Sequence, residues 1–374
     1  MEALKLTLPS ECTDVTIPTE TELIFKVLKK GNGSGLSFVG FYQYEDSPNG
    51  KFPYVEIVKG EGQLYVDKEM TSPTHRVDTA LANRRNYFYI KAISDVLYLK
   101  FSNAQNIRSL YTPTAPESTR SFFAPLSENS PVMDAYLSDF FNAVRLENLT
   151  ITVSGAETKN PQYYHGDLYD LSHIKPLNMI NFENQKHIAG NINDLQAISN
   201  KNMISMFVSK TNIEGTIQNK DDIDTGFNLM SAVFAQNTPN LSFHTSAFKN
   251  RTYMASGNTS WGVTSLQGDL SDLPKVHSLY FRVDKDIKNL VYSRSRSLEF
   301  TNLREFSIIP KMNLGMLEFL VADLSDVSKV SFVQNGLVAL FVEDSEIDNV
   351  SQATKDRITE LRSKGIIFTT NIIV

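Results

Sequence analysis

The chain has 374 residues, of which 41% are hydrophobic and 21% charged, and its formal net charge is −6. This composition is that of a folded protein with a sizeable core. The acidic balance argues against nucleic acid as the main partner, because neutralising phosphates requires a basic surface. The single cysteine, Cys12, excludes an intrachain disulfide and a metal site with several thiolate ligands.

The first residues, MEALKLTLPSECTD, lack a basic stretch followed by an apolar one, so we expect no secretory signal peptide. The most apolar window, Leu314–Leu324, contains two carboxylates and is shorter than the roughly 20 residues that cross a bilayer. We therefore expect no membrane insertion.

Residues 1–90 contain short runs in which apolar and polar side chains alternate, separated by turns rich in glycine. The runs are Thr21–Val27, Leu36–Tyr42, Tyr54–Val58 and Leu64–Val66. Several short strands at this spacing predict a small antiparallel β-sandwich. The glycine cluster at 31–35 lacks the lysine that ends a phosphate-binding loop, and no helical pattern follows it, so we interpret it as a hairpin turn.

Between residues 91 and 150 the pattern changes. Val96–Phe101 followed by Asn103 has the form LxLxxN, and Leu149–Val153 alternates like a strand, so we expect a repetitive part to begin near residue 91. Pro131 is a helix-start signal, and four apolar residues follow it at four-residue spacing: Val132, Tyr136, Phe140 and Val144. This spacing predicts a helix whose apolar face packs on the repetitive part.

From residue 166 onward one phrase recurs: glycine, any residue, leucine or isoleucine, any residue, aspartate, leucine. Gly190 follows Gly166 by 24 positions, and the later copies fall at about one or two such periods. A fixed period of this size indicates a solenoid. The repeat-defining residues are Gly166, Leu168, Leu171, Gly190, Ile192, Leu195, Gly215, Ile217, Gly268, Leu270, Leu273, Leu324 and Val327, and a weaker copy lies at 345–350.

A short alternating run follows most copies of this glycine phrase. The runs are Asn178–Phe182, Ile204–Val208, Ser278–Val283 and Lys329–Val333, and two further strands are expected at Leu241–His244 and Thr252–Ala255. The apolar residues after each glycine are spaced by three, which suits a 3₁₀ stretch facing inward. Stacking such repeats at about 4.8 Å per strand buries their apolar sides and forms a parallel sheet.

The segment Met203–Ile217 resembles the leucine-rich-repeat pattern LxxLxLxxNxLxGxI, with Asn212 one place late. The predicted fold class is therefore mainly β with short helices: a small antiparallel β-sandwich at 1–90, followed by a leucine-rich-repeat-like parallel β solenoid at 91–374. A helix at 352–364, begun by Ser351 and ended by Gly365, and a strand at 366–371 are predicted to cap the solenoid. A right-handed β-helix is the structural alternative.

Candidate chemistry is sparse. His165 and His187 fall on neighbouring repeats if the period holds, which would bring two imidazoles together, but we interpret both as polar loop residues. Four residues share one repeat position, and we interpret them as capping groups of short helices rather than as glycan-cleaving carboxylates: Asp170, Asp194, Asn219 and Asp272. The sequence shows no nucleophile–base constellation. It predicts no catalytic, cofactor-binding or metal-binding residue, no cofactor and no enzymatic activity.

The order of a small β domain and then repeats phrased "GDIxDLxxL" resembles leucine-rich-repeat-like structural proteins of tailed phages of Bacteroidetes-type hosts. This resemblance implies a virion protein of the fibre, baseplate or capsid-attached kind, which presents the solenoid for assembly or host-surface binding. The implied partners are other virion proteins, copies of the chain itself (fibres and spikes are commonly trimers) and a host-surface glycan or protein. The alternatives are a bacterial leucine-rich-repeat-like protein that binds other proteins, either cytoplasmic or exported by a route that leaves no visible signal, and, less favoured, a glycan-cleaving tailspike.

Overall fold

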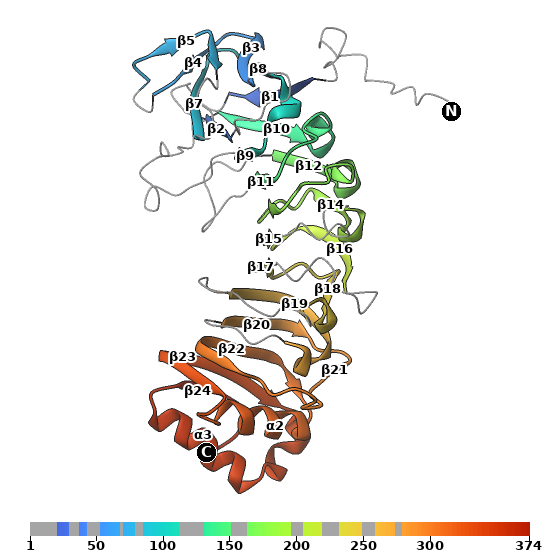
Figure 1. Cartoon of the computed structure of the whole chain (residues 1–374), viewed down its shortest axis with the longest axis vertical. Helices are drawn as coiled ribbons and strands as arrows, with labels where there is room; N and C mark the ends of the chain where they lie inside the picture. The colour runs from blue at the N-terminus through green and yellow to red at the C-terminus, as the bar shows by residue number, and fades with distance from the viewer. Residues whose placement is uncertain are drawn as a thin grey trace, which may run out of the picture.

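The computed structural model describes residues 21–29, 37–42, 53–67, 70–78, 85–111, 131–150, 163–195, 205–218, 232–248, 259–273 and 279–374. Within these residues the chain is mainly β, with a large mixed sheet of many strands and a few short helices. The molecule is elongated, with antiparallel strands at one end and the helices α2 (Leu314–Leu324) and α3 (Gln352–Ser363) at the other (Figure 1). The predictions at 31–35, Thr252–Ala255 and Asn219 lie outside the described residues.

Antiparallel strands form two sheets at the N-terminal end. The first contains, in order, β6 (Arg76–Asp78), β3 (Tyr54–Lys59), β8 (Val96–Ser102) and β1 (Glu22–Leu28). The second contains β5 (Pro73–Thr74), β4 (Gly62–Tyr65), β7 (Arg85–Ala92) and β2 (Ser37–Tyr42). Buried aromatic rings join them, since Phe88 of the second sheet lies 6.0 Å from Phe101 of the first. The four alternating runs predicted before residue 90 overlap β1 to β4, the last of them only at Leu64 and Tyr65.

Two predictions between residues 91 and 150 are wrong. Val96–Phe101 is not a repeat of the solenoid kind, because β8 pairs antiparallel with β1 on one side and β3 on the other. A 3₁₀ helix, η1 (Ala104–Asn106), follows it. The segment predicted to be helical from residue 131 is a strand, β10 (Val132–Tyr136), followed by the 3₁₀ helix η2 (Leu137–Phe140).

The predicted helix does not form because β10 has backbone hydrogen-bond partners on both sides. It pairs antiparallel with β1 and parallel with β12 (Tyr163–Asp167). As a result Met133, Ala135 and Leu137 are buried, whereas Tyr136 and Val144 of the expected face are 56% and 47% exposed. Strand pairing has overridden the local helical spacing.

Two columns of parallel strands continue from the two antiparallel sheets. In the long column, β9 (Ser109–Tyr111) pairs antiparallel with β2 and parallel with β11 (Asn148–Thr150). The column then continues through β13 (Met179–Asn181), β15 (Ser205–Phe207), β17 (Ala232–Ala235), the first half of β19 (Thr259–Asp269), β20 (Leu279–Asp286), β22 (Phe300–Met312), β23 (Val330–Val342) and β24 (Ile367–Thr369).

The short column starts from β1 and β10. It runs through β12, β14 (Ile188–Asn191), β16 (Asn212–Ile217), β18 (Leu241–His244), the second half of β19 and β21 (Leu290–Val291). Short 3₁₀ helices follow its strands, namely η2, η3 (Leu168–Leu171), η4 (Ile192–Asp194), η6 (Thr245–Phe248) and η7 (Leu270–Asp272). Each N-terminal sheet thus extends into one column. A single apolar core runs through the antiparallel sheets and the parallel columns.

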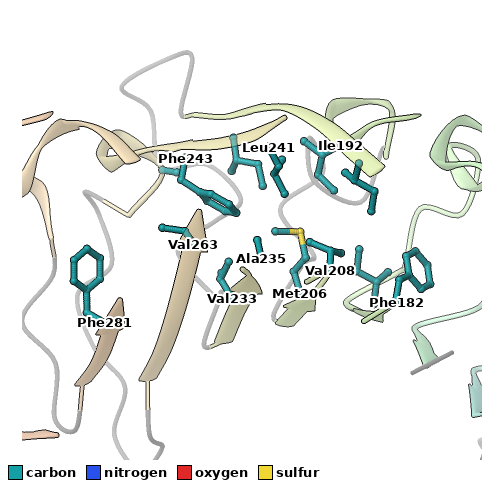
Figure 2. Packing of buried hydrophobic residues seen from close by; sticks show 14 of the residues in the cluster. Phe182, Ile192, Met206, Val208, Val233, Ala235, Leu241, Phe243, Val263 and Phe281 are labelled. Carbon is teal, nitrogen blue, oxygen red and sulfur yellow. The ribbon is translucent and has the colours of Figure 1, made fainter. Parts of the chain in front are cut away.

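The register of the long column aligns its inward side chains in a single row. The row contains Leu110, Leu149, Ile180, Met206, Val233, Phe281, Phe306, Val338 and Phe368, all of them buried. Figure 2 shows Met206 and Val233 of this row facing Ile192, Leu241 and Phe243 from the side of the short column. Each strand therefore covers apolar surface of the strands before and after it, which favours the stacked arrangement.

The recurring glycine marks a close approach between neighbouring repeats. Gly190 has a φ of +102°, and a Cβ there would lie 2.3 Å from Oδ1 of Asp167, the residue that caps η3. Gly215 has a φ of +111°, and its Cβ would lie 2.5 Å from Oδ1 of Asn191, which caps η4. Only glycine combines this backbone conformation with the missing side chain. The apolar repeat-defining residues from Leu168 to Leu273, and Leu324, are buried.

The last two copies of the glycine phrase have a different structure. Leu324 is the final residue of α2, and Val327 lies in the following turn with 75% of its surface exposed, so Val327 is not an inward repeat position. The copy at 345–350 forms a 3₁₀ helix, η8 (Asp344–Asn349). Both copies lack the glycine, which in the earlier repeats is the residue that lets neighbouring turns approach.

The C-terminal elements lie where the sequence predicts them. The Ser351 hydroxyl accepts a hydrogen bond from the Thr354 amide at the start of α3, and Gly365 after its end has a φ of +82°. The predicted terminal strand is β24. Arg362 of α3 donates from Nη2 and Nε to the carbonyl oxygen of Phe368, at 3.1 and 3.3 Å. Helix α3 therefore supplies a hydrogen-bond donor to a backbone carbonyl of β24, the last strand of the long column.

Candidate binding surface

The outer face of the long column carries two rows of positions, one on each side of the buried row. The first row runs through Met179, Ser205, Ala232, Ser260, Tyr280, Glu305, Leu337 and Ile367. The second runs through Asn181, Phe207, Phe234, Gly262, Arg282, Ser307, Ala339 and Thr369. Because neighbouring strands lie about 4.8 Å apart, each row is a closely spaced line of groups along the molecule.

Aromatic rings occupy the middle of this face. The rings of Phe207 and Phe234 are stacked, with centroids 5.2 Å apart and planes inclined by 15°, and the Tyr280 ring lies 6.5 Å from that of Phe234. The next position in the second row is Gly262, where a Cβ would lie 3.2 Å from the Gln236 side chain. The Gln236 amide thus lies over the position without a side chain. β15, β17 and β20 together present a half-buried surface of rings and amide.

Beyond the aromatic rings, the two rows continue with charged and hydroxyl side chains on β20 and β22. Arg282 Nε donates to Asp284 Oδ1 at 2.7 Å, and Ser307 Oγ donates to Glu305 Oε1 at 2.7 Å. Burial and the adjacent Glu305 carboxylate raise the pKa of Tyr280, and the hydrogen bond to Asp284 raises the pKa of Arg282. Tyr280 therefore keeps its proton and Arg282 its charge at neutral pH. Because Glu305 and Ser307 are buried, a bound partner would meet the half-buried rings beside the Arg282–Asp284 pair and not the Glu305 carboxylate.

None of these residues is among the site residues predicted from the sequence. Phe207 and Phe234 each follow a buried inward residue, Met206 and Val233, by one place. Since successive side chains of a strand point to opposite faces, both phenylalanines must point outward. An aromatic residue at the same outward position in two neighbouring repeats is the signal that identifies this face.

The predicted capping carboxylates lie in the 3₁₀ helices. Asp170 Oδ2 accepts a hydrogen bond from the Asp167 amide at 3.4 Å, and Asp194 and Asp272 occupy the same place in η4 and η7. The stronger capping acceptors are one residue before each helix, a position that the sequence analysis missed. They are Asp167, Asn191 and Asp269, which accept from the amides of Tyr169, Asn193 and Ser271 at 2.8, 3.0 and 2.9 Å.

Asp139 in η2 makes an unusual cap, and its substitution tests the local electrostatics. Its carboxylate accepts a hydrogen bond from the Tyr136 amide at 2.7 Å. Burial raises the pKa of this carboxyl to about 6. The hydrogen bond from Tyr136 lowers the pKa, and the nearby carboxylates of Asp134 and Asp170 raise it further. A folded pKa above the unfolded value of about 3.9 means that stability falls as pH rises between these values.

We expect Asp139→Asn to raise the free energy of unfolding at pH 7.5 by about 1–2 kcal/mol, because the amide keeps an acceptor for Tyr136 without a buried charge. At pH 4, where the folded carboxyl is already protonated, the gain should vanish. Urea unfolding at both pH values measures the effect. An equal change at the two pH values would contradict the raised pKa.

The histidines fall into separate environments. The rings of His165 and His187 lie 5.2 Å apart, so the repeat period correctly placed them side by side. Two other described histidines have local partners: His173 Nε2 lies 2.7 Å from the Phe141 carbonyl oxygen, and His244 Nδ1 lies 2.8 Å from Ser246 Oγ. His75 lines a hollow beside the turn between β3 and β4. His277 is outside the described residues.

Among the described residues, no group of three or more histidine, cysteine, aspartate or glutamate side chains is placed to hold a metal ion. The helices of the described ranges include none that is long and apolar enough to cross a membrane. No family model, curated protein or solved structure matches the chain.

Proposed function

We propose that the chain is a non-enzymatic interaction protein. In this proposal its parallel part is a leucine-rich-repeat-like solenoid, its N-terminal part is a small β-sandwich, and the outer face of the long column is the binding surface. The observation that carries the proposal is the continuous strand pairing from β9 to β24. The positions of the two outer rows stay aligned along it, although the register shifts elsewhere between β19 and β20 and between β22 and β23.

The chemistry of these rows supports binding. Phe207, Phe234, Tyr280 and Arg282 are of the residue types that dominate the energetics of protein interfaces. Their positions are set by paired strands rather than by loops, so little ordering cost arises when a partner docks.

We further propose that the protein is a virion component of the fibre, baseplate or capsid-attached type. The support is the resemblance of the glycine phrase to repeats of phage structural proteins. Mass spectrometry of purified phage particles tests this setting. We expect the chain at a fixed ratio to the major capsid protein, whereas a chain abundant in the infected lysate and missing from particles would favour the cytoplasmic bacterial alternative.

The binding surface is tested by the double substitution Phe207→Ala and Phe234→Ala, with Val291→Ala, exposed on the short column, as the control. Labelled protein is titrated onto intact host cells and onto phage particles that lack the protein. Truncating two stacked rings at a binding surface is expected to weaken binding at least about 10-fold. The control should bind as wild type, and circular dichroism should show both variants folded. Folded double-variant protein with unchanged binding would contradict the placement of the site.

A further inference from the structure

A second group of side chains lies on the outer face of the short column, away from the binding surface proposed above. Tyr136 of β10 is in register with His165 of β12, and their rings lie 5.3 Å apart. On the other side of His165 lies His187, the residue before β14, at 5.2 Å. Three rings therefore form one row, with His165 of β12 between Tyr136 of β10 and His187 just before β14.

The middle histidine is oriented by a carboxylate. His165 Nε2 lies 3.3 Å from Asp134 Oδ1, and the other oxygen of Asp134 accepts from Lys26 Nζ at 3.0 Å. A carboxylate at this position favours the tautomer that carries its proton on Nε2. The lone pair of Nδ1 is then available to a ligand. A histidine backed by a carboxylate in this way is a common arrangement at metal sites.

We propose that His165 and His187 together bind a divalent transition-metal ion such as Zn²⁺, Ni²⁺ or Cu²⁺. Imidazole nitrogen is a preferred ligand of these ions, and the two ring centroids lie 5.2 Å apart with their planes inclined by 32°. His187 is exposed and the His165 side chain is 30% exposed, so an ion reaches the pair directly from solvent. Asp134 acts behind His165 as a positioning residue.

This site has two protein ligands, so the remaining coordination positions of the ion go to water. Such an ion exchanges with solvent and binds more weakly than one held by four side chains. The contact of the Tyr136 ring with His165, with planes inclined by 35°, limits rotation of the histidine ring and keeps the pair in place without the ion. Simple ring stacking is the competing explanation, and it predicts no dependence of ion binding on either histidine.

The test is calorimetric titration of the full-length, tag-free chain with NiCl₂ and with ZnCl₂ at pH 7.5. We expect one ion per chain, with affinity reduced at least 10-fold in His165→Ala and in His187→Ala. His173→Ala, whose ring lies against Phe141, is the matched control and should bind as wild type. Asp134→Asn is expected to weaken binding about 10-fold, the usual effect of losing the group behind a ligating histidine.

Electron paramagnetic resonance with one equivalent of Cu²⁺ gives a second readout that does not depend on affinity. Wild-type protein should show two nitrogen ligands, and His187→Ala, which changes an exposed side chain, should show one. The proposal is overturned if wild-type protein binds no ion below millimolar concentration. It is equally overturned if both single histidine variants keep the wild-type affinity.

Discussion

Replacing Asp323 with alanine is expected to lower the free energy of unfolding by about 3 kcal/mol. Asp323 lies near the end of α2, and its side chain is only 3% exposed. It accepts hydrogen bonds from the Tyr292 hydroxyl at 2.6 Å and from Nη2 and Nε of Arg294 at 2.6 and 2.9 Å. Without the carboxylate, a buried hydroxyl and a guanidinium lose their shared acceptor. Urea unfolding at pH 7 measures the loss.

The effect has a defined pH dependence. Burial raises the pKa of Asp323, but the hydrogen bonds from Arg294 and Tyr292 outweigh burial and hold the pKa below its ordinary value. Because the folded pKa is lower than the unfolded value of about 3.9, this stabilisation is present above about pH 4 and is lost as pH falls through the folded pKa. The difference between wild type and Asp323→Ala should therefore shrink at low pH.

Lys329 Nζ lies 3.4 Å from Asp323 and 3.5 Å from Asp326, whose side chain is 36% exposed, so Asp326→Ala is the matched control. Exposed pairs contribute little, so its loss should be much smaller. Equal losses for the two variants would show that burial of Asp323 does not determine its contribution.

Gly190→Ala is expected to destabilise the fold by about 2–3 kcal/mol. The added Cβ would meet Asp167 Oδ1 at 2.3 Å and the Leu168 amide nitrogen at 2.8 Å, and the φ of +102° is strained for any residue with a side chain. Asp167 would have to move, and its hydrogen bond from the Tyr169 amide at 2.8 Å would be lost. Thermal or urea unfolding measures the cost.

The control for this substitution is Gly315→Ala in α2. The nearest atom to its Cβ is Asn313 Oδ1 at 3.7 Å, an ordinary contact. Alanine is a better helix former than glycine, so this variant should gain about 0.5–1 kcal/mol. If both variants shift stability in the same direction, the recurring glycine does not mark a close approach between repeats.

Much of the strand pattern could be predicted from the sequence. Segments such as β1, β13 and β20 bury one face only, and this leaves a clear alternation of apolar and polar residues. The glycine phrase could be found because two physical requirements, a positive φ and no room for a Cβ, permit one residue type at Gly166, Gly190, Gly215 and Gly268.

The neighbours of each strand could not be predicted in the same way. The LxLxxN pattern of β8 suits an antiparallel strand as well as a parallel one, because alternation reports which face is buried and not which strand lies beside it. The four-residue spacing after Pro131 was compatible with a helix, but β1 and β12 supply hydrogen-bond partners that only the assembled fold contains.

The candidate binding surface was missed for a related reason. Tyr280 and Glu305 belong to different strands, and only the pairing of β20 with β22 brings them together. The outward aromatic residues leave a signal at only two neighbouring strands, through Phe207 and Phe234, which is too short to stand out as a period. The proximity of His165 and His187 could be predicted from the sequence. Each residue directly precedes one of the two residues, Gly166 and Ile188, at which β12 and β14 pair.

Successive strands of the long column stack along one axis. Met179 and Ile367 occupy the same row of the long column, seven strand spacings apart. Spin labels on Met179→Cys and Ile367→Cys, in a background with Cys12→Ser, allow their separation to be measured by pulsed electron paramagnetic resonance. Stacked strands predict a single narrow distance near 34 Å, from about 4.8 Å per strand. A broad distribution, or a main distance beyond about 50 Å, would contradict the stacking.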